Sequence, residues 1–371
     1  MVDLKSQYEK IKEEVNASIQ DVLENNTYIN GPLVHQFQAD LETYLGAKHV
    51  IPCANGTDAL QIAMMGLGLQ PGDEVITADF TFAATVEVIA LLQLTPVLVD
   101  VDINNMNISL DGIRKAITPK TKAIVPVHLF GRAANMDAIM EIANEHNLYV
   151  IEDNAQAIGA DYTNKDGVKK KVGTIGHVAA TSFFPSKNLG CYGDGGAIYT
   201  NDDDLAHIIR GIVNHGMYER YHHDVVGVNS RLDSIQAGVL KAKLPHLDTY
   251  NRARQDAARK YTLALGVNPN IVAPTICENC DCHVFHQYVI RITNGKRDAL
   301  LAHLQEKEIP CAIYYPIPLH SQKAYADVRY KEEDFPVTNQ LCKEVIALPM
   351  HTELDDEQIK FITDTVLEFL K

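Results

Sequence analysis

Short apolar runs alternate with helical patterns along the first two thirds of the chain. The runs are rich in β-branched residues and predict strands at 49–54, 74–78, 95–102, 123–130, 148–153, 180–184 and 196–201. Helical patterns lie between them, at 58–68, 82–93, 136–147 and 203–216. Alternating strands and helices, with strands that are nearly all apolar, indicate an α/β domain built on a mostly parallel, buried central sheet.

The last third of the chain follows a different pattern. A long helical stretch runs from 232 to 265 and should bend at Pro245, and isolated strands are expected at 287–292 and 312–317. The 371 residues exceed the roughly 250–300 at which a single core stops growing. We therefore predict a large domain over 1–243 and a smaller C-terminal α/β domain over 244–371, with the N-terminal helix packing on one of them.

Charge and cysteine content narrow the class of protein. The net charge of −15 argues against nucleic acid or an anionic membrane as the main partner. The charged, amphipathic first residues do not resemble a signal peptide, and the longest apolar stretch, 88–101, is too short to span a bilayer. The seven scattered cysteines fit a reducing compartment, so we expect a cytoplasmic protein without disulfides.

One cysteine-rich segment is either a metal site or an exposed loop. The sequence CENCDCH places Cys277, Cys280, Cys282 and His283 close together, and such a spacing can bind zinc. Structural zinc sites usually take ligand pairs from two separate turns, and no second pair follows here. We therefore predict an exposed loop and no metal.

Candidate chemistry follows the strands, since ligands of open α/β sheets bind beyond the carboxyl ends of the strands. After the first strand, Asn55, Gly56 and Thr57 open a helix whose free N–H groups suit a phosphate, although the motif taken alone is more typical of an ordinary helix cap. Asp153 ends the strand at 148–153, close to Gln156. Its carboxylate is either a helix cap or a half-buried charge that needs a partner.

The segment TSFFPSKNLGCYGDGG (181–196) surrounds Lys187 with aromatic residues, proline and glycines. Desolvation lowers the pKa of a lysine, and a neutral amine can attack a carbonyl group to form a Schiff base. Ser182 supplies a hydroxyl donor five residues earlier. The alternative is a solvent-exposed lysine in a loop.

Together these pieces match the needs of pyridoxal 5′-phosphate. That cofactor needs a lysine for its aldehyde, an acid for its ring nitrogen, donors for its phosphate and a partner for its ring face. The chain offers a phosphate cradle, an aromatic residue, an aspartate and a lysine in a consistent order. A nicotinamide enzyme would instead need Gly-x-Gly-x-x-Gly directly after the first strand, which is absent.

The chain resembles the DegT/StrS-type sugar-nucleotide aminotransferases, which have the aspartate aminotransferase fold (fold type I). The resemblance runs through YINGP, ANGTDAL, GDEVITADFTFAAT, VPVHLFG, VIEDNAQAIGA, SFFPSKNLGCYGDGG, GVNSRLD and YYPIPLH. It implies that Lys187 binds the cofactor covalently, Asp153 pairs with the ring nitrogen and Gln156 contacts the phenolic oxygen. It implies a stacking role for Phe82 and phosphate contacts from Gly56, Thr57, Ser182 and, from the neighbouring subunit of a homodimer, Asn229. The implied substrate-binding residues are Tyr28, His222, Arg231, Tyr314, Tyr315 and His320.

Within this family the chain is most similar to aminotransferases acting on UDP-2-acetamido-2-deoxy-3-oxo-glucuronate in surface-polysaccharide (O-antigen) assembly. Phe184 stands where many members have histidine, and Tyr314 where this branch often has histidine. The resemblance implies transamination with L-glutamate as amino donor. The alternatives are a different nucleotide-linked 3- or 4-keto-deoxysugar, and a non-catalytic regulator or scaffold on this fold.

A sugar nucleotide carries several negative charges, and the chain is strongly acidic. We therefore expect a local basic patch where such a substrate binds. The segment ERYHHDVVGVNSR offers Arg220, His222, His223 and Arg231. We expect the guanidinium of Arg231 to bind the substrate's carboxylate or diphosphate, since its geometry suits both. The alternative is an incidental surface pair between Arg231 and Asp233.

Overall fold

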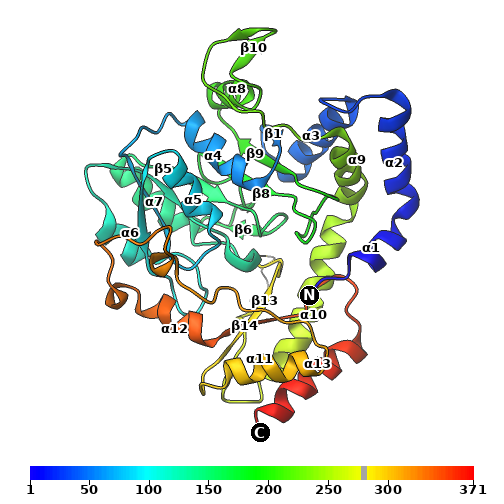
Figure 1. The fold of residues 1–371 in the computed structure, drawn as a ribbon, viewed down its shortest axis with the longest axis vertical. Helices are drawn as coiled ribbons and strands as arrows, with labels where there is room; N and C mark the ends of the chain where they lie inside the picture. Colours follow the sequence, from blue (N-terminus) through cyan, green and yellow to red (C-terminus); the bar gives the residue numbers. More distant parts are fainter. Residues whose placement is uncertain (277–281) are drawn as a thin grey trace.

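The computed structural model describes residues 1–276 and 282–371 and contains a seven-stranded central sheet with the strand order β1-β9-β8-β5-β4-β2-β3 (Figure 1). The strands are β1 His49–Cys53, β2 Glu74–Ala78, β3 Thr95–Val99, β4 Thr121–Val125, β5 Tyr149–Asp153, β8 Val178–Ser182 and β9 Gly196–Thr200. Neighbours from β3 to β8 pair in parallel, and β9 runs antiparallel to both β8 and β1. The predicted mostly parallel sheet is confirmed.

Helices cover both faces of this sheet. Successive strand residues point to opposite faces, so Val75 and Ile151 pack on one side while Ile76 and Val150 pack on the other. The first side is covered by α4 Gly56–Gly66, α5 Ala84–Leu91 and α8 Asp203–Ile212. The second side is covered by α6 Leu110–Ala116, α7 Met136–His146, α3 Pro32–Leu45 and α9 Ser234–Lys243. Burial of both faces explains why the strand sequences read as continuous apolar runs.

Three predicted strands differ clearly from the structure, and the first of them, expected at 95–102, ends at Val99. The strand expected at 123–130 ends at Val125, because Pro126 has no N–H to continue the ladder. The strand expected at 312–317 is wrong: Ala312 alone forms a bridge, to Ala347, and residues 313–317 are irregular. Prolines at 316 and 318 remove ladder donors there.

A long helical segment connects the sheet to the C-terminal part. It is interrupted at the predicted place, by the 3₁₀ turn Leu244–His246, and continues as α10 Leu247–Leu265. The remaining elements are β12 Ile271–Val272, β13 Tyr288–Ile292, α11 Arg297–Glu306, α12 Pro336–Glu344, β14 Val345–Leu348 and α13 Asp356–Phe369. The three strands form an antiparallel sheet, and one face of it packs with α10, α11 and α13 in a separate buried cluster. The buried apolar residues of α12 belong instead to the cluster of the large sheet. The domain division at 243/244 stays a prediction.

The chain's first helices lie along α9, away from the sheet edge formed by β3 (Figure 1). They are α1 Leu4–Lys10 and α2 Lys12–Asn25, and α2 packs against α9. The N-terminus also contacts the C-terminal part, since Met350 N–H donates to the Met1 carbonyl.

Two small hairpins complete the fold. One pairs β6 Asp161–Thr163 with β7 Lys169–Lys171, and the other pairs β10 Met217–Glu219 with β11 His222–His223. The second hairpin projects from the body beyond α8 (Figure 1). Among the described helices, none is long and apolar enough to cross a membrane.

Candidate active site

A cavity of about 620 Å³ lies at the carboxyl ends of the parallel strands, where an open α/β sheet binds its ligands. The irregular 312–317 segment of the C-terminal part closes one side of it. The cavity gathers most of the site residues predicted from the sequence: Gly56, Thr57, Phe82, Asp153, Gln156, Ser182, Lys187, Tyr314 and Tyr315.

The start of α4 forms one end of the cavity. Asn55 caps this helix by accepting from Asp58 N–H at 2.8 Å, which leaves the N–H groups of Gly56 and Thr57 without a helix partner. A Cβ atom on Gly56 would lie 2.6 Å from Ser182 Cβ, so only glycine lets β8 come this close. The structure confirms Asn55 as a helix cap. Free N–H groups at a helix start beside a hydroxyl suit a phosphate, and that role of Gly56, Thr57 and Ser182 stays a prediction.

Lys187 follows β8 and is half-buried in the cavity wall. Burial lowers the pKa of its amine to about 8, while the nearby Asp153 carboxylate opposes the shift. The neutral fraction of the amine near neutral pH is therefore larger than that of an exposed lysine, while the charged form still predominates. The neighbouring Phe183 does not shield the amine directly, because its ring packs edge-on against Phe37 in the core.

Asp153 lies at the end of β5 and is 5 % exposed. Its carboxylate accepts from the Thr85 hydroxyl at 2.8 Å and from Ala155 N–H at 3.1 Å. Burial outweighs these two hydrogen bonds and raises the pKa of the carboxyl group. A buried carboxylate in this condition is stabilised by a cationic partner, and a protonated ring nitrogen entering the cavity would supply one.

Gln156 is held in one orientation by its neighbours. Its Oε1 accepts from Phe130 N–H at 2.6 Å, and its Nε2 donates to the Tyr315 hydroxyl at 3.2 Å. Because Tyr315 accepts from Gln156, its own hydroxyl proton is available to a ligand in the cavity. Phe82 is 57 % exposed beside this pair, with its ring centroid 6.4 Å from that of Tyr315. Its open face can accept a flat ring.

Five predicted residues lie outside this cavity: Tyr28, His222, Asn229, Arg231 and His320. Tyr28 is 45 % exposed near the chain's first helices, and His222 is exposed on β11. Asn229 is exposed and forms a bridge with Asn214. Arg231 is half-buried and donates from Nη1 to Asn214 Oδ1 at 3.2 Å, and among the described residues it forms no ion pair with Asp233.

His320 has a different role from the one predicted. It is 8 % exposed, its Nδ1 lies 2.7 Å from Asp79 Oδ2, and its ring stacks on Phe335 at 4.4 Å. It does not line the cavity. The side chain fastens the segment after 318 to the end of β2, so direct contact with a substrate does not fit its position.

The cavity also contains residues that sequence reasoning missed, notably His286, Phe130 and Phe184. His286 is 5 % exposed, and its Nδ1 has no hydrogen-bond partner within the described residues. Burial, Lys187 and Arg254 place the pKa of His286 well below its ordinary value, so the ring is neutral. His286 precedes a strand of the C-terminal sheet, and the only sequence signal was its place in HVFHQYVIR.

Two residues of the cysteine-rich segment, Cys277 and Cys280, lie outside the described residues. His283 is buried, its Nδ1 accepts from Phe285 N–H, and its ring stacks on that of Phe285. Residues 1–276 and 282–371 hold no group of three metal-ligating side chains. The expectation that no metal binds here stays a prediction.

Comparison with known proteins places this cavity in a family. Residues 9–367 match the model of the DegT/DnrJ/EryC1/StrS aminotransferase family. The chain is 48 % identical to a UDP-2-acetamido-2-deoxy-3-oxo-D-glucuronate aminotransferase of Pseudomonas aeruginosa, covering 97 % of each. It is 46 % identical to a pleiotropic regulatory protein of Geobacillus stearothermophilus, covering 100 % of this chain and 98 % of the other.

A solved structure shows the same fold. A DegT DnrJ EryC1 StrS aminotransferase from Brucella abortus superposes with a TM-score of 0.94 at 41 % identity, covering 100 % of this chain and 98 % of the other. The cavity described above is lined by Lys187, Asp153 and the start of α4, the residues expected from the sequence to hold the cofactor. The chain therefore belongs to the DegT/DnrJ/EryC1/StrS aminotransferase family and is a pyridoxal-phosphate-dependent aminotransferase.

Proposed function

We propose that this enzyme transfers the amino group of L-glutamate to the C3 keto group of UDP-2-acetamido-2-deoxy-3-oxo-D-glucuronate. The observation that carries the proposal is the pairing, in one cavity, of a lysine with a lowered pKa and a buried carboxylate with a raised pKa. The 48 % identical Pseudomonas aeruginosa protein supports this choice of sugar.

Residues of this chain take separate roles in the transfer. When bound, pyridoxal phosphate supplies an aldehyde for amine exchange and a ring that accepts electrons. The N–H groups of Gly56 and Thr57 and the hydroxyl of Ser182 would hold its phosphate. Asp153 would keep a proton on its ring nitrogen, and Gln156 would contact its phenolic oxygen. Lys187 would first hold the cofactor and then, as a free amine, move a proton at its Nζ.

The sugar nucleotide would bind toward the open side of the cavity. The free hydroxyl proton of Tyr315 would donate to a sugar oxygen, with Tyr314 beside it. Tyr28, His222 and Arg231 do not line the cavity of their own chain, which favours a homodimer in which each subunit completes the other's site. The exposed side chains near the hairpin, such as Tyr221 and Val226, support a covered surface there. In that arrangement Asn229 would reach the partner's phosphate site and Arg231 its anionic substrate.

The cellular setting is part of the same proposal. Cys53, Cys191 and Cys342 are buried free thiols, which fits a reducing cytoplasm. An amino sugar made there on a nucleotide carrier would serve the assembly of a surface polysaccharide such as O-antigen. The alternative is a different nucleotide-linked 3- or 4-keto-deoxysugar as the amino acceptor.

A turnover assay decides between these functions. Purified enzyme is mixed with L-glutamate and the 3-keto glucuronate nucleotide, and the 2-oxoglutarate and amino sugar formed are quantified. We expect equimolar products with the native chain and none with Lys187→Ala. Turnover with only a dTDP-linked 4-keto-deoxysugar would overturn the choice of sugar, and no turnover with any keto sugar would overturn the proposed function.

A further inference from the structure

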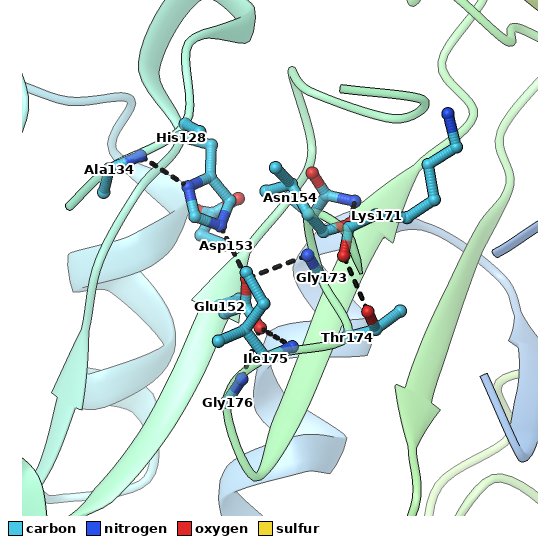
Figure 2. Close-up of polar contacts among 12 residues, drawn as sticks. His128, Ala134, Glu152, Asp153, Asn154, Lys171, Gly173, Thr174, Ile175 and Gly176 are labelled. Atoms are coloured by element: carbon cyan, nitrogen blue, oxygen red, sulfur yellow. Dashed lines mark hydrogen bonds and ion pairs between the residues drawn. The ribbon is translucent and has the colours of Figure 1, made fainter. Parts of the chain in front are cut away.

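Behind Asp153, on the opposite side of β5, lies a second buried carboxylate. Glu152 is 0 % exposed and accepts hydrogen bonds from His128 Nε2 at 2.9 Å and Gly173 N–H at 2.8 Å (Figure 2). Ile175 N–H and Gly176 N–H donate to its other oxygen at 2.7 and 2.6 Å. Each oxygen of the Glu152 carboxylate thus accepts hydrogen bonds, and its negative charge is stabilised without any group from the cavity.

His128 is the one side chain in this set of donors, and its protonation pattern follows from its contacts. Its ring is 0 % exposed, and Nδ1 accepts from Ala134 N–H at 3.1 Å. An acceptor nitrogen carries no proton, so the proton is on Nε2 and points at Glu152 (Figure 2). The imidazole therefore connects a backbone N–H to the Glu152 carboxylate.

The main chain of His128 also holds Asp153. The parallel ladder between β4 and β5 covers only Ala123–Tyr149 and Ile124–Val150. It resumes as a single bridge between Val127 and Asp153, in which Asp153 N–H donates to Pro126 at 2.9 Å and His128 N–H donates to the Asp153 carbonyl at 3.1 Å. Segment 126–128 therefore depends on its own anchors, and the ring of His128 is one of them.

Glu152 extends the same support to the strand that carries Ser182. The turn 173–176 donates to Glu152 and leads directly into β8. Gly173 has φ +92°, a conformation that other residues rarely adopt, so this turn is shaped for the contact. Through Glu152, the network thus connects segment 126–128, on one side of β5, with the 173–176 turn that leads into β8, on the other side.

We propose that His128, through its hydrogen bond to Glu152, is a positioning residue that holds the Asp153 carboxylate in line with the cofactor's ring nitrogen. The inference rests on the proposed role of Asp153. Without the proton on His128 Nε2, segment 126–128 loses its hydrogen bond to Glu152. The Asp153 carboxylate is then no longer held in one orientation. The specific consequence is a weaker preference for a ring that carries a protonated nitrogen, while the phosphate end of the cavity keeps its contacts.

The test measures that preference directly. The probes are pyridoxamine 5′-phosphate, which cannot join covalently to Lys187, and its analogue with a C–H group in place of the ring nitrogen. Dissociation constants of both are measured for the full-length protein freed of cofactor. We expect the native chain to bind the nitrogen-containing probe about tenfold or more tightly, as a charged hydrogen bond requires.

Matched variants separate positioning from general structure. Asp153→Asn should abolish the preference. His128→Asn keeps an acceptor for Ala134 N–H but no donor for Glu152, and should lose most of the preference; His128→Gln can still donate to Glu152 and should recover much of it. His177→Asn serves as control, because His177 Nδ1 accepts from Val150 N–H at the other end of β5. It should leave the preference unchanged.

The outcomes distinguish the two claims. If Asp153→Asn keeps the preference, the proposed role of Asp153 fails. If Asp153→Asn loses it but His128→Asn keeps the native ratio, the inference about His128 is overturned while the role of Asp153 stands. Should His128→Asn not fold, Glu152→Asp decides, because its shorter side chain cannot reach both His128 and the 173–176 turn. A native ratio in that variant would also contradict the proposal.

Discussion

Glu152 and Asp153 are adjacent carboxylates on one strand, yet their surroundings differ completely. Glu152 faces away from the cavity, and the donors around it keep the pKa of its carboxyl group below the ordinary value despite full burial. Asp153 faces the cavity, its side-chain donors within the described residues are Thr85 and Ala155, and burial raises the pKa of its carboxyl group. The first charge is completed by the protein itself, whereas the second is left for a ligand to complete.

The largest expected effect comes from a substitution of Glu152, the carboxylate that is fully hydrogen-bonded within the protein. Glu152→Gln places an amide against N–H donors and leaves buried groups unpaired, so we expect the free energy of unfolding to fall by about 3–5 kcal/mol. Urea unfolding of the cofactor-free chain at neutral pH measures it. A loss below about 1 kcal/mol would show that the hydrogen bonds around Glu152 contribute little.

Asp153→Asn should reduce turnover and leave the stability of the folded chain intact, in contrast to Glu152→Gln. We expect turnover to fall about 100-fold or more, as about 2.7 kcal/mol of lost ring-nitrogen stabilisation implies, while the cofactor-free chain is no less stable than the native one. Steady-state kinetics and urea unfolding of the same preparation test both statements. A variant that loses stability but keeps turnover would reverse the assignment of the two carboxylates.

The pH dependence of stability should distinguish the carboxylates further. A raised folded-state pKa favours the protonated form, so the contribution of Asp153 is favourable at low pH and is lost as pH rises from its unfolded value, about 3.9, through the folded value. The contribution of Glu152 is present above its unfolded value, about 4.3, and is lost as pH falls through its lowered folded value. Asp153→Asn should therefore gain stability over the native chain at pH 7 and not at pH 3. An equal difference at both values would contradict the raised pKa.

Thr85→Val, which acts on the Asp153 carboxylate, should produce a smaller effect, on the affinity for the cofactor. It keeps the shape of the side chain but removes the 2.8 Å hydrogen bond to Asp153, which lowers the pKa of that carboxyl group. Because the cavity then holds a less readily ionised acid, affinity for pyridoxamine 5′-phosphate should fall about tenfold, or about 1.4 kcal/mol. Calorimetry measures the change, and native affinity in Thr85→Val would show that the hydroxyl is dispensable.

The smallest expected effect is a shift in the titration of Lys187. In the cofactor-free chain its acylation should reach half its maximum near pH 8, since burial lowers the pKa of the amine to about 8. Asp153 raises that pKa, so Asp153→Asn should move the midpoint to lower pH. Peptide mass spectrometry after acylation at a series of pH values reads both midpoints, and an upward shift would contradict the pairing.

Residues that end predicted strands were the most predictable part of the site. Asp153 and the Asn55–Thr57 turn follow apolar strands, and parallel strands bring their carboxyl ends to one edge. Lys187 was identifiable from its unusual neighbours, although burial in the cavity wall rather than direct cover by Phe183 accounts for its lowered pKa. The family resemblance added the remaining roles residue by residue.

Contacts between distant parts of the chain could not be predicted. Nothing in VIED distinguishes the two carboxylates, because the partners of Glu152 lie 21 to 24 residues away and meet it only in the folded sheet. His286 and the 312–317 segment belong to the C-terminal part and reach the cavity through tertiary packing. The bond between His320 and Asp79 spans 241 residues, so sequence reasoning assigned that histidine to the substrate.

The most direct test of the central claim is to find which lysine carries the cofactor. A second buried lysine, Lys243, also has a pKa lowered to about 8, but its Nζ donates to the Gly190 carbonyl at 2.6 Å and does not face the cavity. The chain loaded with pyridoxal phosphate is reduced with borohydride, digested and sequenced by mass spectrometry. We predict the reduced cofactor on Lys187 alone; its attachment to Lys243, or its absence from Lys187, would contradict the account.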